Sequence, residues 1–234
     1  MTSLKDSVAL VTGGSRGLGR ALVQALYERG AAKVYATARD PRTVTHPDAV
    51  PLALEVTDPD SVRAAAARAE DVTVLINNAG ISLKARSFLD SPVEDIRREF
   101  ETNFYGPLLV TRAFVPVLER NGGGHLLNVH SVLSWLGVAG SYSATKAALW
   151  SQTNTLRLEL QPRGIAVTGL HVGYIDTDMA AGIDAPKSTP GDVAGLALDG
   201  IEAGAHEVLA DDLSREVKAG LSADLAVLYP QLAG

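Results

Sequence analysis

The chain has 234 residues, 46% of them hydrophobic, and its 21 Lys and Arg against 27 Asp and Glu give a net charge of −6. This length suits one large core, although two small domains would also fit. No cluster of basic residues indicates a nucleic-acid groove or a surface for anionic membranes, and no apolar stretch nears the roughly 20 residues that cross a bilayer. The absence of cysteine excludes disulfides, thiolate chemistry and cysteine-based zinc sites.

The histidines and the N-terminal stretch give two further exclusions. The five histidines are scattered without the spacing of metal ligands, so we expect no metal site; they are His46, His125, His130, His171 and His206. Residues 1–14 have no basic stretch leading into a long apolar core, which predicts no signal peptide. We therefore expect a cytoplasmic protein whose residues 1–234 form a single domain.

Short apolar runs alternate along the chain with helical patterns. Runs rich in Val, Leu and Ile predict strands at 8–12, 33–38, 50–56, 72–77, 124–131, 165–172 and 206–211. Helical spacing predicts helices at 18–30, 60–70, 91–121, 141–164 and 190–203, with a further helical segment near the C-terminus. Strands without polar alternation are buried on both faces, so we expect an α/β doubly wound fold, a seven-stranded parallel sheet with helices on both faces. Ligands of such folds lie at the carboxyl ends of the strands.

The first expected strand runs into TGGSRGLG (12–19), which opens the first expected helix. Gly13, Gly17 and Gly19 permit a tight turn, close approach of the backbone to a pyrophosphate, and close packing of helix on sheet. N–H groups at the helix start and the helix dipole favour the anion. Turns use glycine for many reasons, but this position between strand and helix predicts a dinucleotide site.

The end of the second strand indicates which dinucleotide binds. NAD sites usually place an acidic residue there, bonded to the ribose 2′-hydroxyl, whereas here Ala38 is followed by Arg39. Arg39 and Arg16 of the glycine loop offer two guanidinium groups to a 2′-phosphate, which favours NADP(H) over NAD(H). The alternative is that both arginines are solvated and Asp40 takes the acidic role.

The segment YSATK places Tyr142 and Lys146 four residues apart, on one face of the fourth helix. An unperturbed tyrosine has a pKa of about 10, too high for efficient acid–base work at neutral pH. A nearby ammonium, with an oxidised nicotinamide ring adding to the field, would lower that pKa. Taken alone, the same spacing also describes an ordinary surface helix.

Other polar residues give YSATK a context. Ser131 ends a strand shortly before Tyr142, and its hydroxyl could polarise a carbonyl oxygen that Tyr142 also contacts. Asn103 lies within a helix, where asparagine is unfavourable. Asn77 and Asn78 end the fourth strand and could fix the backbone around a cofactor.

Together these segments resemble the short-chain dehydrogenase/reductase family in its short, single-domain branch. TGGSRGLG, NNAG, the Asn of ETNFYG, the Ser of NVHS and YSATK occur in the order of that family, at close to its spacings. GYIDTDM (173–179) resembles the segment that contacts the nicotinamide carboxamide in the family. The resemblance runs from about residue 6 to about residue 211.

The resemblance implies a role for each matching position. Tyr142 would be the acid–base residue, and Lys146 would bind ribose and lower the pKa of the tyrosine. Ser131 would stabilise the reacting oxygen, and Asn103 would hold a water in the proton relay. The implied cofactor contacts are Gly13, Ser15, Arg16 and Leu18 for the phosphates, Arg39 for the 2′-phosphate, Glu55 and Val56 for adenine, Asn78, Ala79 and Gly80 for ribose, and Val172, Ile175 and Thr177 for the carboxamide.

The chain departs from the family pattern at several positions. Glu55 stands where Asp or Asn is usual, and Val172 replaces a proline. His130 stands where a second serine is common, and we expect it to be a strand-end residue rather than a catalyst. Ser134 is a weaker alternative to Ser131.

The predicted function is an NADP(H)-dependent oxidoreductase that moves hydride between nicotinamide and a ketone, aldehyde or secondary alcohol. The alternatives are an NAD-linked alcohol dehydrogenase and a non-catalytic dinucleotide sensor, which would be expected to have lost the tyrosine or lysine. Trp135, Leu136 and Val138 would line the substrate pocket, or Trp135 would pack on a neighbouring helix or subunit. A short flap at 179–190 favours an open pocket. We expect a homo-oligomer, a dimer rather than a tetramer, with the helices at 91–121 and 141–161 as a possible interface.

Overall fold

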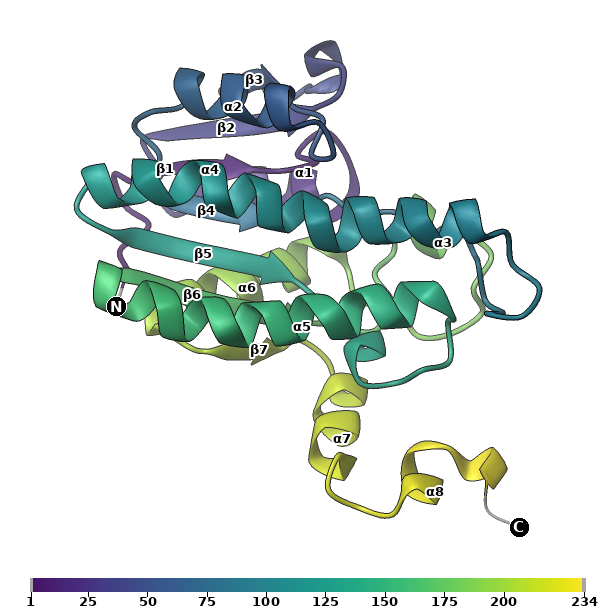
Figure 1. The fold of residues 1–234 in the computed structure, drawn as a ribbon. Coiled ribbons are helices and arrows are strands. Elements are labelled where there is room, and N and C mark those ends of the chain that lie inside the picture. The colour runs from purple at the N-terminus through teal and green to yellow at the C-terminus, as the bar shows by residue number, and fades with distance from the viewer. Residues whose placement is uncertain (1, 233–234) are drawn as a thin grey trace.

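The computed structural model describes residues 2–232, which build one seven-stranded parallel sheet with helices on both faces (Figure 1). The strand order is β3-β2-β1-β4-β5-β6-β7. The strands are β1 (Val8–Val11), β2 (Lys33–Ala38), β3 (Val50–Ala53), β4 (Val74–Asn77), β5 (Gly124–Val129), β6 (Ile165–His171) and β7 (Glu207–Leu209). The helices are α1 (Gly17–Glu28), α2 (Pro59–Arg68), α3 (Val93–Phe100), α4 (Gly106–Arg120), α5 (Ser141–Leu160), α6 (Pro190–Ala203), α7 (Asp212–Gly220) and α8 (Leu225–Leu228).

Two apolar clusters sandwich the sheet. One cluster joins α1 and α6 to one face, and Leu22, Leu26 and Ile201 are fully buried in it. The other joins α2, α4 and α5 to the opposite face around Phe114 and Leu118, which are also fully buried. Because the central strands are covered on both sides, their sequences show no polar alternation.

Local sequence signals set the ends of several helices. Asp58 accepts a hydrogen bond from the N–H of Asp60 and caps α2, and Thr189 caps α6 in the same way through the N–H of Asp192. Each of these helices has proline in its first turn, where no intrahelical N–H is needed. Gly204, with φ of +67°, ends α6 in the left-handed region that favours glycine.

The predicted fold class is confirmed, and each predicted strand and helix has a counterpart. The expected helix at 91–121 differs in one respect, because α3 and α4 are joined by a π-helical turn, Glu101–Tyr105, that contains Asn103. The C-terminal helical segment is two short helices, α7 and α8, which extend from the edge of the sheet (Figure 1). Within residues 2–232 no helix is long and apolar enough to cross a membrane.

Candidate active site

The glycine loop after β1 is joined to the NNAG loop after β4 by a compact set of hydrogen bonds. The hydroxyl of Thr12 accepts from the backbone N–H groups of Asn78 (2.9 Å) and Ala79 (3.0 Å). The side-chain amide of Asn78 donates to the carbonyls of Thr12 (2.9 Å) and Gly13 (3.3 Å). A Cβ on Gly19 would lie 2.0 Å from the Gly13 carbonyl oxygen, so the start of α1 packs against the loop as only glycine allows.

Of the two predicted asparagines, only Asn78 faces the glycine loop. Asn77 is 3% exposed and points into the core, where its amide donates to Thr111 (3.1 Å) and Asn128 (2.9 Å). Asn128 in turn donates to Thr153 at 2.8 Å. This buried polar chain links β4, β5, α4 and α5 beneath the site.

The arginines predicted for the 2′-phosphate are exposed at the ends of β1 and β2. Arg16 forms an ion pair with Asp178 at 3.2 Å, across the space between the glycine loop and the loop after β6. Within residues 2–232, Arg39 makes no ion pair. The carboxylate of Asp40 accepts from the guanidinium of Arg42 at 2.8 and 2.9 Å and from its backbone N–H at 3.0 Å. Asp40 therefore caps and stabilises the short turn that follows it, Pro41–Thr43.

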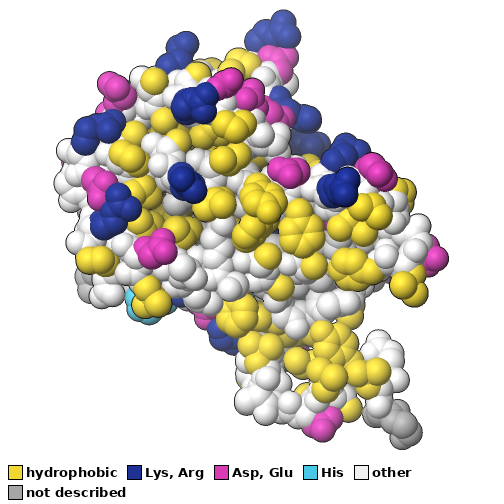
Figure 2. All heavy atoms as spheres, viewed as in Figure 1, with side chains coloured by type: hydrophobic (Ala, Val, Ile, Leu, Met, Phe, Trp, Pro, Cys, Tyr) yellow, Lys and Arg dark blue, Asp and Glu magenta, His cyan; other side chains and the backbone are white. Residues whose placement is uncertain are grey.

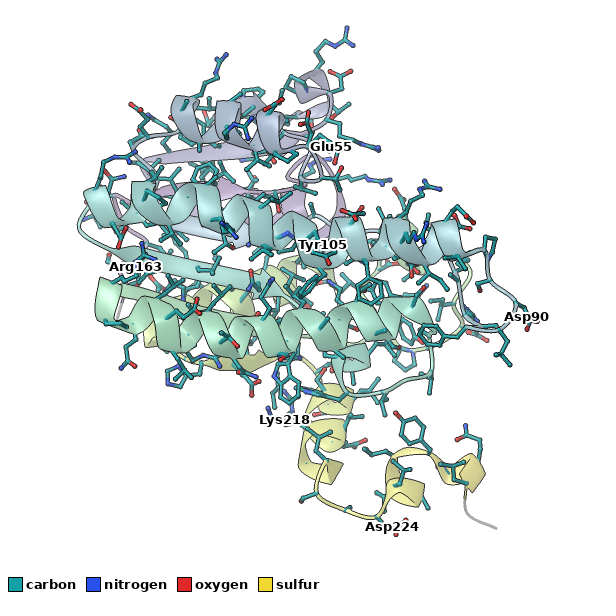
Figure 3. The ribbon with its side chains drawn as sticks, viewed as in Figure 1. Glu55, Asp90, Tyr105, Arg163, Lys218 and Asp224 are labelled. Carbon is teal, nitrogen blue, oxygen red and sulfur yellow. The ribbon has the colours of Figure 1, made fainter. Side chains whose placement is uncertain are left out.

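The residues predicted for adenine lie just after β3. Glu55 folds back on Thr57, whose N–H (3.2 Å) and hydroxyl (3.0 Å) both donate to the same carboxylate oxygen. Figure 3 shows Glu55 at the end of the sheet where the β1 and β2 loops also lie. Val56 is buried and packs on Gly106, where a Cβ would lie 2.9 Å from a Val56 methyl. The side chain of Glu55 is thus engaged locally, and Val56 supports the start of α4.

Tyr142 and Lys146 stand on the first turns of α5, at the carboxyl edge of the sheet. The ammonium of Lys146 lies 5.7 Å from the centre of the Tyr142 ring and donates to the Val129 carbonyl at the end of β5 (2.8 Å). Lys146 is 5% exposed and Tyr142 is half-buried. A Cβ on Gly80 would lie 4.0 Å from the lysine nitrogen, so the NNAG loop also reaches this point.

Ser131 lies two residues after the end of β5 and caps a short 3₁₀ turn, Val132–Ser134, which packs against α5. Its hydroxyl accepts from the N–H of Leu133 at 3.1 Å, which leaves the hydroxyl proton available to a further acceptor. Ser134 is buried to 5% exposure, and its hydroxyl has no partner within the described chain. The structure therefore brings Ser131, Tyr142 and Lys146 to one edge.

Asn103 owes its position to the π-helical turn. Its side chain forms two hydrogen bonds with the backbone of Ile81, accepting from the N–H and donating to the carbonyl, both at 2.9 Å. The same amide donates to Thr145 on α5 at 3.2 Å. A π turn widens the helix by one residue, and such turns are frequent at functional sites. Asn103 thus ties α3, the segment after NNAG and α5 together next to Lys146.

Burial shifts the two titratable groups of α5 in opposite directions. It raises the pKa of Tyr142 to about 12, with the carboxylate of Glu99 adding to the rise, and it lowers the pKa of Lys146 to about 8. Both shifts favour the neutral form, as desolvation does. In the chain on its own, burial and Glu99 therefore set the pKa of Tyr142, and the lowering expected from Lys146 together with an oxidised nicotinamide stays a prediction for the cofactor complex.

The segment predicted for the carboxamide follows β6 and touches the glycine loop. Val172 is buried, and its carbonyl accepts from the N–H of Val132 at 2.9 Å. Ile175 pairs with Ser188, which closes the short 179–190 segment back onto its start. The methyl of Thr177 would lie 3.2 Å from a Cβ on Gly17. Asp211, which caps α7, also accepts from the N–H of Gly173 at 2.6 Å and so fixes this loop without the usual proline.

Trp135 is buried in packing contacts, as the second of its two predicted roles had it. Its ring stacks on His171 at 4.0 Å between centroids, and His171 stacks on His130 at 4.7 Å. Lys218 of α7 lies 4.9 Å from the Trp135 ring and pairs with Glu207 of β7 (Figure 3). Val138 is 55% exposed, so it remains available to a pocket wall. His130 is a buried residue of this stack, next to Ser131 in sequence.

The sequence profile described as short chain dehydrogenase matches residues 7–188, which contain the glycine loop, NNAG, Asn103, Ser131, Tyr142 and Lys146. The chain belongs to the short-chain dehydrogenase family.

Relatives of this short-chain dehydrogenase include proteins that are named as reductases. The NADPH-dependent 1-acyldihydroxyacetone phosphate reductase of Schizosaccharomyces pombe is 37% identical over 183 residues, 74% of this chain and 61% of that protein, so the match leaves over a third of it uncovered. The 3-oxoacyl-acyl-carrier-protein reductase FabG of Vibrio cholerae is 32% identical over 80% of this chain and 81% of its own. A short chain dehydrogenase from Burkholderia cenocepacia, solved in complex with NADP, has a TM-score of 0.93, 38% identity and 99% coverage of both chains.

Two parts of this short-chain dehydrogenase escaped the sequence analysis. Glu99 is fully buried beside Tyr142. It stands four residues before Asn103, and this helical spacing could have indicated that Glu99 also faces the site. The stack of Trp135, His171 and His130 joins residues from three segments, and no local pattern foretells it.

The buried histidine next to Ser131 predicts an acid-sensitive fold. His130 is 2% exposed, both ring nitrogens lack partners within residues 2–232, and its pKa is well below 6.5 because of burial and the nearby His171 and Lys146. The unfolded chain takes up a proton below about pH 6.5 and the folded chain does not, so stability present above that pH is lost as the pH falls. This histidine accounts for a loss of about 2 kcal/mol between pH 7 and pH 5.

Urea unfolding of the His130→Ser variant at both pH values is the measurement. We expect its free energy of unfolding to fall by about 2 kcal/mol less than that of the wild type over this range. His206→Ser is the matched control, since His206 is exposed. Equal pH dependence of wild type and His130→Ser would show that His130 has the same pKa in the folded and the unfolded chain, and would contradict the prediction.

Proposed function

We propose that this protein is an NADPH-dependent reductase that converts a ketone or aldehyde to an alcohol, with Tyr142 as the proton donor. The observation that carries the proposal is the placing of Tyr142 and Lys146 on one face of α5, with the Ser131 turn packed on that helix. In the chain on its own the pKa of Tyr142 is about 12, so its hydroxyl is protonated at neutral pH, and the mechanism requires the ammonium of Lys146 to stabilise the phenolate as the proton leaves.

The residues of this chain fit a nicotinamide dinucleotide that carries a 2′-phosphate. The glycine loop offers backbone N–H groups at the start of α1, where an anion is favoured. Arg39 is exposed, and the Arg16–Asp178 pair is exposed on both sides, so its loss would cost only about 0.2–1 kcal/mol. Asp40 already accepts three hydrogen bonds from Arg42, which leaves it less available than an unpaired carboxylate to accept from a 2′-hydroxyl. These features favour NADP(H) over NAD(H).

The proposed mechanism divides the work among four side chains. NADPH, when bound, supplies the hydride that reaches the carbonyl carbon. Tyr142 donates its proton to the carbonyl oxygen, and Ser131 donates a hydrogen bond to the same oxygen, so the product is a neutral alcohol. The ammonium of Lys146 stabilises the phenolate that forms, and Asn103 holds the Ile81 backbone and Thr145 in place around it. Water returns the proton to Tyr142.

Two relatives support a ketone as the substrate class. The fission-yeast protein is named for reduction of an acyldihydroxyacetone phosphate and the Vibrio protein for reduction of a 3-oxoacyl group, and both names denote ketones. Val138 and the 179–190 segment are the candidate contacts for the substrate chain. The rival proposals, an NAD-linked alcohol dehydrogenase or a sensor without turnover, are separated by the two variants below.

Self-association is a further part of the proposal. Figure 2 shows hydrophobic side chains along the face made by α4 and α5 and on the C-terminal helices. Tyr105 (45% exposed) and Leu158 (74%) lie on the first surface, and Leu225 (59%) and Val227 (61%) lie on α8. We expect a homodimer that buries one of these surfaces. Sedimentation equilibrium should give twice the chain mass, and a monomer at micromolar concentration would exclude it.

Replacing Tyr142 with phenylalanine removes the proton donor and leaves the ring. We expect kcat for ketone reduction to fall by about 10²- to 10⁴-fold, with little change in the Kd of NADPH. The measurement is loss of reduced-nicotinamide absorbance with a ketone panel, beside fluorescence titration of NADPH. Tyr105→Phe is the control, because Tyr105 lies on the outer surface of the same edge (Figure 3). Retained turnover in Tyr142→Phe would refute the mechanism.

Replacing Arg39 with alanine tests the cofactor assignment. A hydrogen bond to a charged group contributes about 1.5–3 kcal/mol, so we expect KM for NADPH to rise about 10- to 150-fold while kinetics with NADH stay unchanged. Arg120→Ala is the control, since Arg120 is exposed at the opposite edge of the sheet. A wild-type preference for NADH would overturn the roles given to Arg16 and Arg39.

A further inference from the structure

Glu99 is a buried carboxylate that the proposed mechanism does not use. It lies on α3, is 0% exposed, and takes part in no ion pair among residues 2–232. One oxygen accepts from the backbone N–H of Leu83 at 2.6 Å, and the other accepts from the hydroxyl of Ser141. An unpaired carboxylate is costly to bury, and a merely structural contact could use a neutral side chain. The charge therefore requires an explanation.

The two partners of Glu99 belong to the walls of the active site. Leu83 is in the 81–86 loop that follows NNAG, and Ser141 is the first residue of α5, directly before Tyr142. Ser141 also donates its N–H to the Ala85 carbonyl at 3.2 Å. Lys84 has φ of +60°, a conformation that side chains other than glycine rarely adopt. Glu99 thus holds a strained loop against the helix that carries the tyrosine.

The start of α5 explains how the charge is tolerated. This helix is 20 residues long, and its N-cap residue, Gly140, supplies no side-chain cap. The positive end of the helix dipole favours a negative group at this point. Glu99 supplies that group from another helix, so the carboxylate is stabilised by N-terminal peptide dipoles rather than by a cation.

The charges around Tyr142 come from few groups. Lys146 faces its ring from the same helix, and Glu99 faces it from α3; Lys84 and Arg86 of the 81–86 loop are exposed to solvent. The carboxylate of Glu99 opposes ionisation of Tyr142 and adds to the effect of burial. The ammonium of Lys146 has the opposite sign, so the two groups oppose each other in their effect on the phenol.

We propose that Glu99 is a positioning residue of the reaction centre, which holds the 81–86 loop to the first turn of α5 and, through its charge, favours the protonated form of Tyr142. This inference rests on the proposed function of Tyr142. It assigns to Glu99 no contact with substrate or cofactor.

The test uses the pH profile of the reverse reaction. Oxidation of the alcohol product at saturating NADP⁺ needs ionised Tyr142, so kcat/KM rises with pH through the apparent pKa of the tyrosine. Glu99→Gln keeps the size of the side chain and removes the charge, and we expect this limb to move about one pH unit lower, with faster oxidation at pH 7. Glu99→Asp keeps the charge and shortens the reach, and its limb should stay near that of the wild type.

Hydrogen exchange separates the positioning role from the charge. We expect the Leu83 amide to exchange faster in Glu99→Asp, whose shorter side chain cannot reach both Leu83 and Ser141, and to stay near the wild-type rate in Glu99→Gln, whose amide oxygen still accepts from this N–H. If Glu99→Gln is not recovered folded, an ultraviolet titration of wild type against Tyr142→Phe gives the tyrosine pKa directly. A value above the ordinary 10 is expected, and a value at or below 10 overturns the inference.

The failures of the two proposals differ. An unshifted limb in folded Glu99→Gln, or equal shifts in Glu99→Gln and Glu99→Asp, overturns the role of Glu99 and leaves the reductase intact. Turnover by Tyr142→Phe overturns the reductase mechanism itself.

Discussion

The hydrogen bonds of Thr12 and Asn78 join the loops after β1 and β4, and the arrangement of the site depends on this junction. These strands are neighbours in the sheet, but α1 leaves β1 toward one face and the chain after β4 leads to α3 and α4 on the other. Doubly wound folds bind dinucleotides at the carboxyl edge of the sheet, at the point where the connections diverge in this way. Without the Thr12 hydroxyl, two backbone N–H groups would lose their acceptor, and the glycine loop would lose its tether to NNAG.

A second junction links the cofactor side to the reacting side. Asn103 forms hydrogen bonds with Ile81, directly after NNAG, and with Thr145 on α5. Glu99, one helical turn earlier, forms hydrogen bonds with Leu83 in the same loop and with Ser141 on α5. Buried polar groups without partners cost free energy, so these pairs specify a single arrangement of α3 against α5. The π turn places Asn103 in the required direction between two regular helices. The π-helical turn is thus both the irregular part of the helix and the feature that positions Asn103.

The sequence allowed prediction of the sheet, the loops at its carboxyl edge and the residues that meet there. Those features follow from apolar runs and from motifs confined to a few consecutive residues, such as TGGSRGLG and NNAG. Contacts between distant segments could not be predicted from the sequence. They include the stack of Trp135 on His171, the ion pair of Lys218 with Glu207, and the hydrogen bond from the N–H of Gly173 to Asp211. The hydrogen bonds from Arg42 to Asp40 could not be predicted either, although the two residues are only two apart, because a sequence pattern does not determine side-chain rotamers.

The electrostatics of Tyr142 and Lys146 differ between the chain on its own and the reacting complex that the proposal describes. Desolvation acts on each group separately and favours its neutral form. It therefore raises the pKa of Tyr142 to about 12 and lowers the pKa of Lys146 to about 8. At neutral pH the tyrosine therefore holds its proton and the lysine keeps its charge. The ammonium lies 5.7 Å from the centre of the tyrosine ring. At this distance it interacts weakly with the neutral phenol before the reaction, but it attracts the phenolate as the phenolate forms. An interaction stronger in the transition state than in the ground state is the kind that lowers a barrier.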